Sequence, residues 1–146
     1  MICLLAQLNP QSFTVGRKIN ITNDSVSNGA KSQFHHFFPT KSTAIIGNAA
    51  YKTVVNNVVN IVFTDALTIN QISNRNPSDY IAEFTAANPD LTEALDSHYI
   101  DLSGYGIASD DFSEFLNARS KAFYNKLCGY IIPCGHDTIA DTAFTI

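Results

Sequence analysis

Cysteine is scarce in this 146-residue sequence, and its spacing does not fit zinc or redox chemistry. The three cysteines, Cys3, Cys128 and Cys134, form no C-x-x-C pair. A zinc knuckle and a dithiol redox motif are therefore excluded. We expect three reduced thiols, with Cys3 and Cys128 in the core, and a cytoplasmic location.

The sequence also lacks tryptophan and long hydrophobic runs. The longest apolar stretches are far too short to cross a bilayer, so we expect no membrane partner. Residues 1–6 are apolar but have no basic start and no cleavage site, so we expect the edge of a helix there and not a secretory signal. Charged residues make up only 15% of the chain and hydrophobic residues 45%. This composition predicts one globular domain over residues 1–146.

Charge is distributed unevenly along the chain. Residues 1–76 carry six Lys or Arg and two Asp, a net charge of +4, whereas residues 77–146 carry three Lys or Arg and eleven Asp or Glu, a net charge of −8. The overall charge of −4 would by itself disfavour a nucleic-acid partner. The distribution is nevertheless compatible with a phosphate-facing first half and an acidic, solvated second half.

Hydrophobic periodicity predicts short strands in the first half and helices in the second. The predicted strands cover residues 17–22, 32–37 and 60–63. We expect helices over 2–8, over about 43–50, from a Thr64 or Asp65 cap to 73, over 77–87, over 89–97 and from 112 to about 128. Gly129 is a candidate C-cap for the last of these helices. That helix carries an amphipathic stripe that predicts burial against the core, formed by Phe112, Phe115, Leu116, Arg119 and Phe123.

Two adjacent histidines, His35 and His36, stand at the end of the predicted strand 32–37. Successive side chains on a strand face opposite sides, so an isolated pair of this kind is most simply one buried and one exposed residue. Distortion before Pro39 would let one ring bind a metal while the other faces water. Asn60 at the start of the returning strand and Asn70 on the following helix complete a set that suits phosphodiester hydrolysis with one divalent cation.

The order of these motifs resembles a known family. The matching segments are His35-His36-Phe37-Phe38-Pro39, Asn60-Ile61-Val62-Phe63, Asn70-Gln71-Ile72-Ser73-Asn74-Arg75-Asn76-Pro77-Ser78-Asp79-Tyr80, Ser97-His98-Tyr99-Ile100 and Asp110-Asp111-Phe112-Ser113-Glu114-Phe115-Leu116-Asn117-Ala118-Arg119. Together they resemble the C-terminal HNH domain of GmrSD-type (ParB-like plus HNH) type IV restriction endonucleases over about residues 4–128. Two departures are Phe37 in place of a more common isoleucine and Asp101 in place of a proline.

The resemblance implies an α+β fold. A ββα-metal (HNH or His-Me finger) unit would occupy about residues 17–76, embedded in and followed by a mainly helical bundle over 77–128, with a tail at 129–146. The ParB-like half of such proteins is absent from these residues. We therefore expect either a C-terminal fragment of a longer protein with an N-terminal ParB-like domain, or a stand-alone domain.

The resemblance also implies roles for four residues. His35 would bind the metal, and His36 would be the general base that takes a proton from water. Asn60 would hydrogen-bond the loop so that His36 is oriented, and Asn70 would offer its amide oxygen to the cation. A histidine and an asparagine with several waters favour Mg²⁺ or Mn²⁺ over a structural Zn²⁺ site.

Other polar residues have weaker assignments. Asp65 is either an additional metal ligand or, more simply, a helix cap. Lys41 and Arg75 are candidates for DNA phosphate contacts and equally for surface charges. His98 is interpreted as a packing or capping residue, and His136 has no assigned role.

The resulting hypothesis is a metal-dependent DNA endonuclease domain that acts in restriction of foreign or modified DNA. An alternative is a catalytically degenerate module that binds nucleic acid or docks a partner. The endonuclease hypothesis requires His35, His36 and Asn70 to converge on one accessible cleft, and Asn70 pointing into the core would contradict it. A second alternative is a protein-interaction domain built on the acidic half. An exposed apolar face at Phe112, Phe115 and Phe123 would favour that reading.

Overall fold

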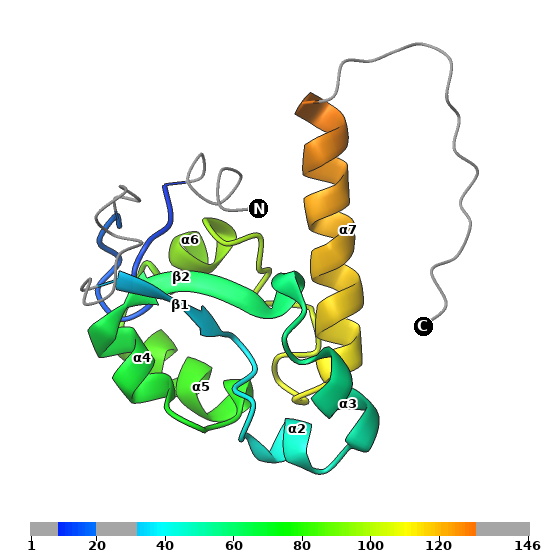
Figure 1. Cartoon of the computed structure of the whole chain (residues 1–146). Helices are drawn as coiled ribbons and strands as arrows, with labels where there is room; N and C mark the ends of the chain where they lie inside the picture. Colours follow the sequence, from blue (N-terminus) through cyan, green and yellow to red (C-terminus); the bar gives the residue numbers. More distant parts are fainter. Residues whose placement is uncertain (1–8, 20–31, 131–146) are drawn as a thin grey trace.

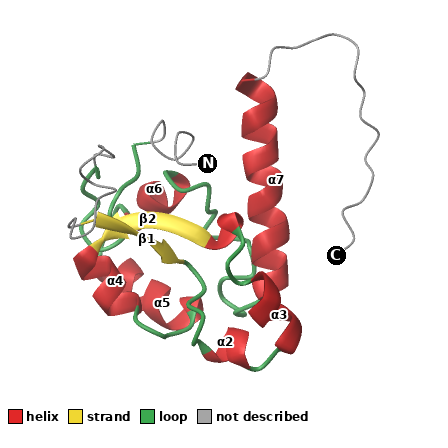
Figure 2. Cartoon of the chain, viewed as in Figure 1, coloured by secondary structure: helices red, strands yellow, loops and turns green. Residues whose placement is uncertain are grey.

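The computed structural model describes residues 9–19 and 32–130, which form an α+β fold (Figures 1 and 2). The predicted helix over 2–8, Cys3, Cys134, His136 and the end of the tail lie outside the described residues. In the view of Figure 1 a small sheet crosses the middle of the fold, with α6 above it, α4 and α5 below it, and α7 at one end. None of the described helices has the length and apolar character needed to span a bilayer.

The sheet is a two-stranded antiparallel ladder of β1 (Ser32–His36) and β2 (Ile61–Asp65). Ser32 pairs with Asp65 at one end, and His36 pairs with Ile61 at the other. Aromatic and β-branched residues favour this extended conformation. The predicted strand over 17–22 is represented by an isolated bridge between Gln11 and Lys18, and its residues 20–22 lie outside the described part.

The connection between the strands contains two short helices where the sequence predicted one. They are α2 (Thr43–Ile46) and α3 (Ala49–Val54). The break has a local cause, because Gly47 ends the first helix and the Asn48 side chain accepts a hydrogen bond from the Ala50 amide to start the second. A 3₁₀ turn, η2 (Val58–Asn60), leads into β2, so Asn60 precedes the strand that it was predicted to open.

Helix α4 (Ala66–Ile72) follows β2 without a loop and contacts both strands. Asp65 is its N-cap: the carboxylate accepts hydrogen bonds from the amide of Thr68 at 2.9 Å and from its hydroxyl at 3.2 Å. Ser73 ends the helix at a positive φ of 50°. The interpretation of Asp65 as a helix cap is therefore confirmed.

Three further helices cover the second half: α5 (Pro77–Ala87), α6 (Leu91–Asp96) and α7 (Phe112–Tyr130). The α5 bounds are those predicted, and Asp111 accepts from the Glu114 amide at the start of α7. The prediction that Gly129 caps α7 is wrong, because the helix continues through it to Tyr130. A glycine ends a helix where the chain turns at positive φ, and Gly129 is not among the glycines with positive φ.

The core is centred on the two phenylalanines that follow the histidine pair. Phe37 stacks on Phe115 of α7 with ring centroids 4.8 Å apart, and Phe38 packs against Phe112 and Phe115 at 5.2 and 5.0 Å. The buried Tyr80 hydroxyl donates to the Phe37 carbonyl at 2.6 Å. These contacts attach the end of β1 to α5 and α7.

The predicted stripe of α7 is buried along its whole length, from Phe112 to Phe123. Phe112, Phe115 and Phe123 therefore form no exposed apolar face. This contradicts the observation that would have favoured a protein-interaction domain. Beyond Phe123 the helix carries exposed residues, including Cys128, so the expectation of a buried Cys128 is wrong. In Figure 1 this end of α7 extends past the sheet and α6, and within the described residues the last core side chain of the helix is Phe123.

Candidate functional site

The two histidine rings lie close together at the end of β1. Their centroids are 6.5 Å apart and the ring planes are nearly perpendicular, at 73°. His35 is half-buried, and its Nε2 atom is shielded from solvent without a hydrogen-bond partner among the described residues. Burial lowers the pKa of His35, and the neighbouring His36 lowers it further. The ring is therefore neutral near pH 7 and keeps a lone pair that a metal ion can use.

His36 is also half-buried, and it contacts a residue that the sequence reasoning did not single out. Its Nε2 lies 2.9 Å from Oδ1 of Asn56 in the loop after α3. The signal in the sequence was an Asn-Asn pair in a segment of otherwise apolar residues, 54–59. Its partner could not be inferred, because the loop that brings the two together has no regular periodicity.

Asn60 is completely buried. Its Oδ1 accepts from the Phe38 amide at 2.8 Å, and its Nδ2 donates to the carbonyls of Phe38 and Val55, both at 2.9 Å. The Phe37 amide also donates to the Asn60 carbonyl at 2.8 Å. These are the loop-pinning bonds that the sequence assignment required, and they fix the main chain immediately after His36. The contribution of Asn60 to catalysis stays a prediction.

A buried arginine supports the same loop from the α7 side. Arg119 donates from Nη1 to the Val59 carbonyl, and from Nε and Nη2 to the His98 carbonyl at 3.1 and 3.0 Å. Its guanidinium lies over the rings of Phe115 and Phe123. Burial lowers the pKa of Arg119 to about 9, so the group remains charged at neutral pH. Sequence reasoning placed Arg119 in the apolar stripe but missed this function.

His98 packs beside Arg119 and is completely buried. Its ring lies edge-on to Phe13 at 4.9 Å, and its Nε2 is 3.1 Å from the Gln11 carbonyl. Because a carbonyl oxygen only accepts, Nε2 carries the proton. Burial and the Arg119 charge lower the pKa of His98 to about 3. The interpretation of His98 as a packing residue is confirmed.

Asn70 lies on α4 and is exposed, so it does not point into the core. No hydrogen bond among the described residues joins it to His35 or His36. Within the same residues, no group of three or more His, Cys, Asp or Glu side chains gathers to form a metal site. The predicted ligands, His35 and Asn70, include only one residue of these four types, so the absence of such a group does not test them. The unpartnered Nε2 of His35 is the atom that fits a metal ion, and a second ligand from Asn70 stays a prediction.

The two candidate phosphate contacts differ in their surroundings. Lys41 is exposed shortly after Pro39. Arg75 forms a two-pronged ion pair with Glu83, at 2.8 and 2.7 Å, which raises the pKa of Arg75 and lowers that of Glu83. A phosphate would have to displace the carboxylate from Arg75, whereas Lys41 forms no ion pair among the described residues and so suits a phosphate contact better.

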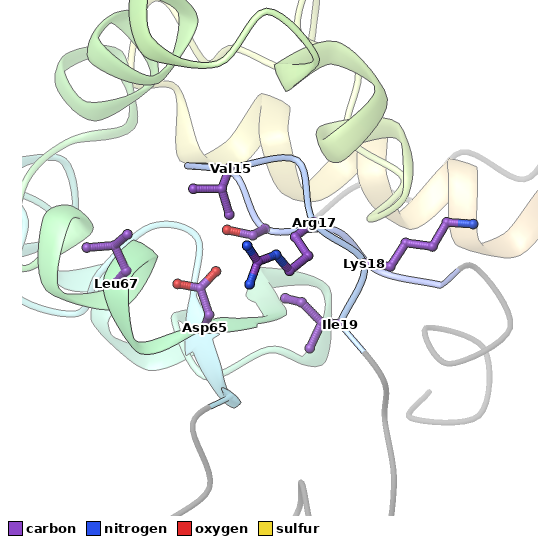
Figure 3. A pocket seen from close by; sticks show the side chains of 7 residues that line it. Val15, Arg17, Lys18, Ile19, Asp65 and Leu67 are labelled. Carbon is purple, nitrogen blue, oxygen red and sulfur yellow. The ribbon is translucent and has the colours of Figure 1, made fainter.

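A pocket of about 470 Å³ lies at the other end of the hairpin. Its walls are Ser12, Val15, Arg17, Lys18, Ile19, Asp65 and Leu67 (Figure 3). Figure 3 shows the Arg17 side chain directed toward Asp65. Asp65 pairs with Ser32, so the length of β1 separates this pocket from His36. Of the candidate site residues that the sequence indicates, only Asp65 lines this pocket.

No protein-family model matches the chain, and neither the curated proteins nor the solved structures contain a match to it.

Proposed function

We propose that the chain is a metal-dependent DNA endonuclease domain of the HNH type, whose ββα-metal unit is formed by β1, β2 and α4. The observation that carries this proposal is the end of β1, where two imidazoles lie 6.5 Å apart on a main chain fixed by Asn60. The buried, unpartnered Nε2 of His35 supports a ligand role for that residue. The direct passage from β2 into α4 supports the unit as a whole.

Each residue then has one task in phosphodiester hydrolysis. His36 takes a proton from water, the resulting hydroxide oxygen bonds to phosphorus, and the bond from phosphorus to the leaving sugar oxygen breaks as that oxygen gains a proton from solvent. His35 and Asn70 would hold one Mg²⁺ or Mn²⁺, which supplies positive charge for the phosphoryl and leaving oxygens. Asn60 keeps the His36 main chain in place.

DNA binding is part of the proposal. Lys41, which is exposed and forms no ion pair among the described residues, is the better candidate for a phosphate contact, and the net charge of +4 over residues 1–76 supports an anionic partner for this half. Such a modest charge supplies limited affinity. An N-terminal ParB-like domain in a longer protein would provide the remainder, and restriction of foreign or modified DNA in the cytoplasm is the proposed role.

A second candidate is a nucleic-acid-binding module that has lost cleavage. It is favoured by the absence, among the described residues, of a hydrogen bond between Asn70 and either histidine. In this case the fold and the Asn60 hydrogen bonds would persist, but the cation would lack its second protein ligand.

The decisive experiment is plasmid nicking with Mg²⁺ or Mn²⁺ by the wild type and by His36→Ala. We expect a loss of nicking on the order of 100-fold or more, the contribution of a general base. Asn117→Ala, at an exposed position of α7, is the matched control and should cut like the wild type. Equal cutting by wild type and His36→Ala would refute the nuclease assignment, and DNA binding without any cutting would favour the second candidate.

A further inference from the structure

The contact between Asn56 and His36 joins an exposed side chain to the ring of the proposed base. Asn56 is exposed, and within the described residues its side chain makes one hydrogen bond, the 2.9 Å contact from Oδ1 to Nε2 of His36. The neighbouring asparagines have other tasks: Asn57 caps η2 and Asn60 pins the main chain. The Asn56 side chain is thus directed at the ring of the proposed base.

The loop that carries Asn56 is held at both ends. The Asn60 side chain donates to the Val55 carbonyl just before Asn56, and the Asn60 amide donates to the Asn57 carbonyl just after it, at 2.8 Å. Arg119 holds the next part of the loop through the Val59 carbonyl. An exposed side chain on a fixed loop loses less conformational entropy when it makes a directed hydrogen bond.

We propose that Asn56 is a positioning residue that sets the ring orientation and the tautomer of His36. An amide oxygen only accepts hydrogen bonds, so the proton of the neutral ring resides on Nε2. Nδ1 then keeps the free lone pair and is the atom that takes the proton from water. The step balances simply: the water O–H bond breaks, an N–H bond forms at Nδ1, and the Nε2 proton stays on the ring.

The identity of the proton-accepting nitrogen rests on the proposed function, whereas the tautomer and its dependence on Asn56 do not. Asn56→Leu keeps the side-chain size and removes the acceptor, and Asn56→Asp restores an oxygen acceptor. Asn117→Leu on α7 is the matched control at an exposed position. All four proteins, wild type included, are compared at the same mildly alkaline pH.

The first measurement is nitrogen-resolved NMR of the imidazoles, with His36 assigned by its loss in His36→Gln. We expect a single Nε2–H tautomer in the wild type, Asn56→Asp and the control, and a mixture of both tautomers in Asn56→Leu. A proton on Nδ1 in the wild type, or an unchanged tautomer in Asn56→Leu, would overturn the proposal. This measurement is valid even for a protein that cuts no DNA, so it separates failure of this inference from failure of the proposed function.

The second measurement is steady-state nicking. We expect Asn56→Leu to lower kcat on the order of 10- to 100-fold with KM unchanged, the range for groups that orient a functional imidazole. Asn56→Asp should recover most of that loss, and the unfolding temperatures of all variants should agree. A fall in kcat that follows a fall in unfolding temperature would instead show a structural role.

Discussion

Asn60 and Arg119 both hold the same loop by hydrogen bonds, yet they differ in charge. Asn60 is neutral, and its amide makes three hydrogen bonds to main-chain atoms. Arg119 is charged and equally buried, and in the described part of the chain its partners are two carbonyl oxygens and two aromatic rings. The loop is thus fixed by one neutral and one cationic side chain.

The difference teaches how burial of a polar group translates into stability. Moving a neutral amide out of water costs little free energy when its hydrogen bonds to water are replaced. Little of the stabilisation from the Asn60 hydrogen bonds is therefore offset. A buried cation has a desolvation cost of several kcal/mol, and carbonyl oxygens compensate it only in part. We therefore expect Asn60 to contribute more net stability than Arg119, although both are completely buried.

The largest expected effect is that of Asn60→Ala. It leaves the Phe38 amide and the carbonyls of Phe38 and Val55 buried without partners, at about 1–3 kcal/mol each. Allowing for partial relaxation, we expect the free energy of unfolding to fall by about 4 kcal/mol. Urea denaturation measures this value, with the exposed Asn74→Ala as control. A loss below about 1 kcal/mol would contradict the expectation that Asn60 contributes more net stability than Arg119.

An intermediate effect is expected on acidification. The pKa of His98 is about 3 in the folded state, against 6.5 for the free side chain, so the unfolded chain binds more protons between these pH values. Stability contributed by neutral His98 is therefore lost as pH falls below 6.5, at up to about 1.4 kcal/mol per unit. Lowering the pH from 8 to 5 should cost about 2 kcal/mol, and His35 adds a contribution of the same sign.

Two measurements isolate the His98 contribution. The dependence of unfolding free energy on pH should be shallower in His98→Gln than in the wild type. In the native protein, the His98 imidazole signals should not titrate in NMR between pH 5 and pH 7. A normal titration near 6.5 would mean that the Arg119 region is more hydrated than its burial indicates.

The smallest expected effect is that of Arg119→Met. Methionine fills the space between Phe115 and Phe123, and the loss of three hydrogen bonds to two carbonyls is offset by removal of the desolvated charge. We expect a net loss of about 1 kcal/mol by urea denaturation. Arg119→Lys, which keeps the charge without the planar fork, should be worse than Arg119→Met. A loss of unfolding free energy as large as that of Asn60→Ala would show that the hydrogen bonds of Arg119 compensate the desolvation cost of its buried charge.

Much of the helical framework could be predicted from the sequence because its signals are local. Asn-Pro pairs set the start of α5 and the approximate start of α6, and Asp65 capped α4 as expected. The buried stripe of α7 followed from helical spacing alone. Gly129 and Cys128 were misjudged because the stripe gives no sign of where the core ends along a helix.

The site could be predicted only in part. The histidine pair and Asn60 are adjacent to strand signals, so their proximity followed from a hairpin. The Asn56 contact and the Arg119 hydrogen bonds depend on how an irregular loop meets a distant helix, which local patterns do not encode. Asn70 was placed on the correct helix, but periodicity does not determine the distance from its amide to His35.

The hydrogen bonds of the Asn60 side chain have a consequence for sequence variation. All of its partners are main-chain atoms, so the bonds do not depend on which side chains positions 38 and 55 carry. The exposed side chain of Val58 in η2 can therefore change while these hydrogen bonds, and the path of the chain after His36, persist. The main chain that follows the histidine pair is therefore held by bonds that exposed side chains do not make. Such side chains could be replaced to change substrate contacts without altering these hydrogen bonds.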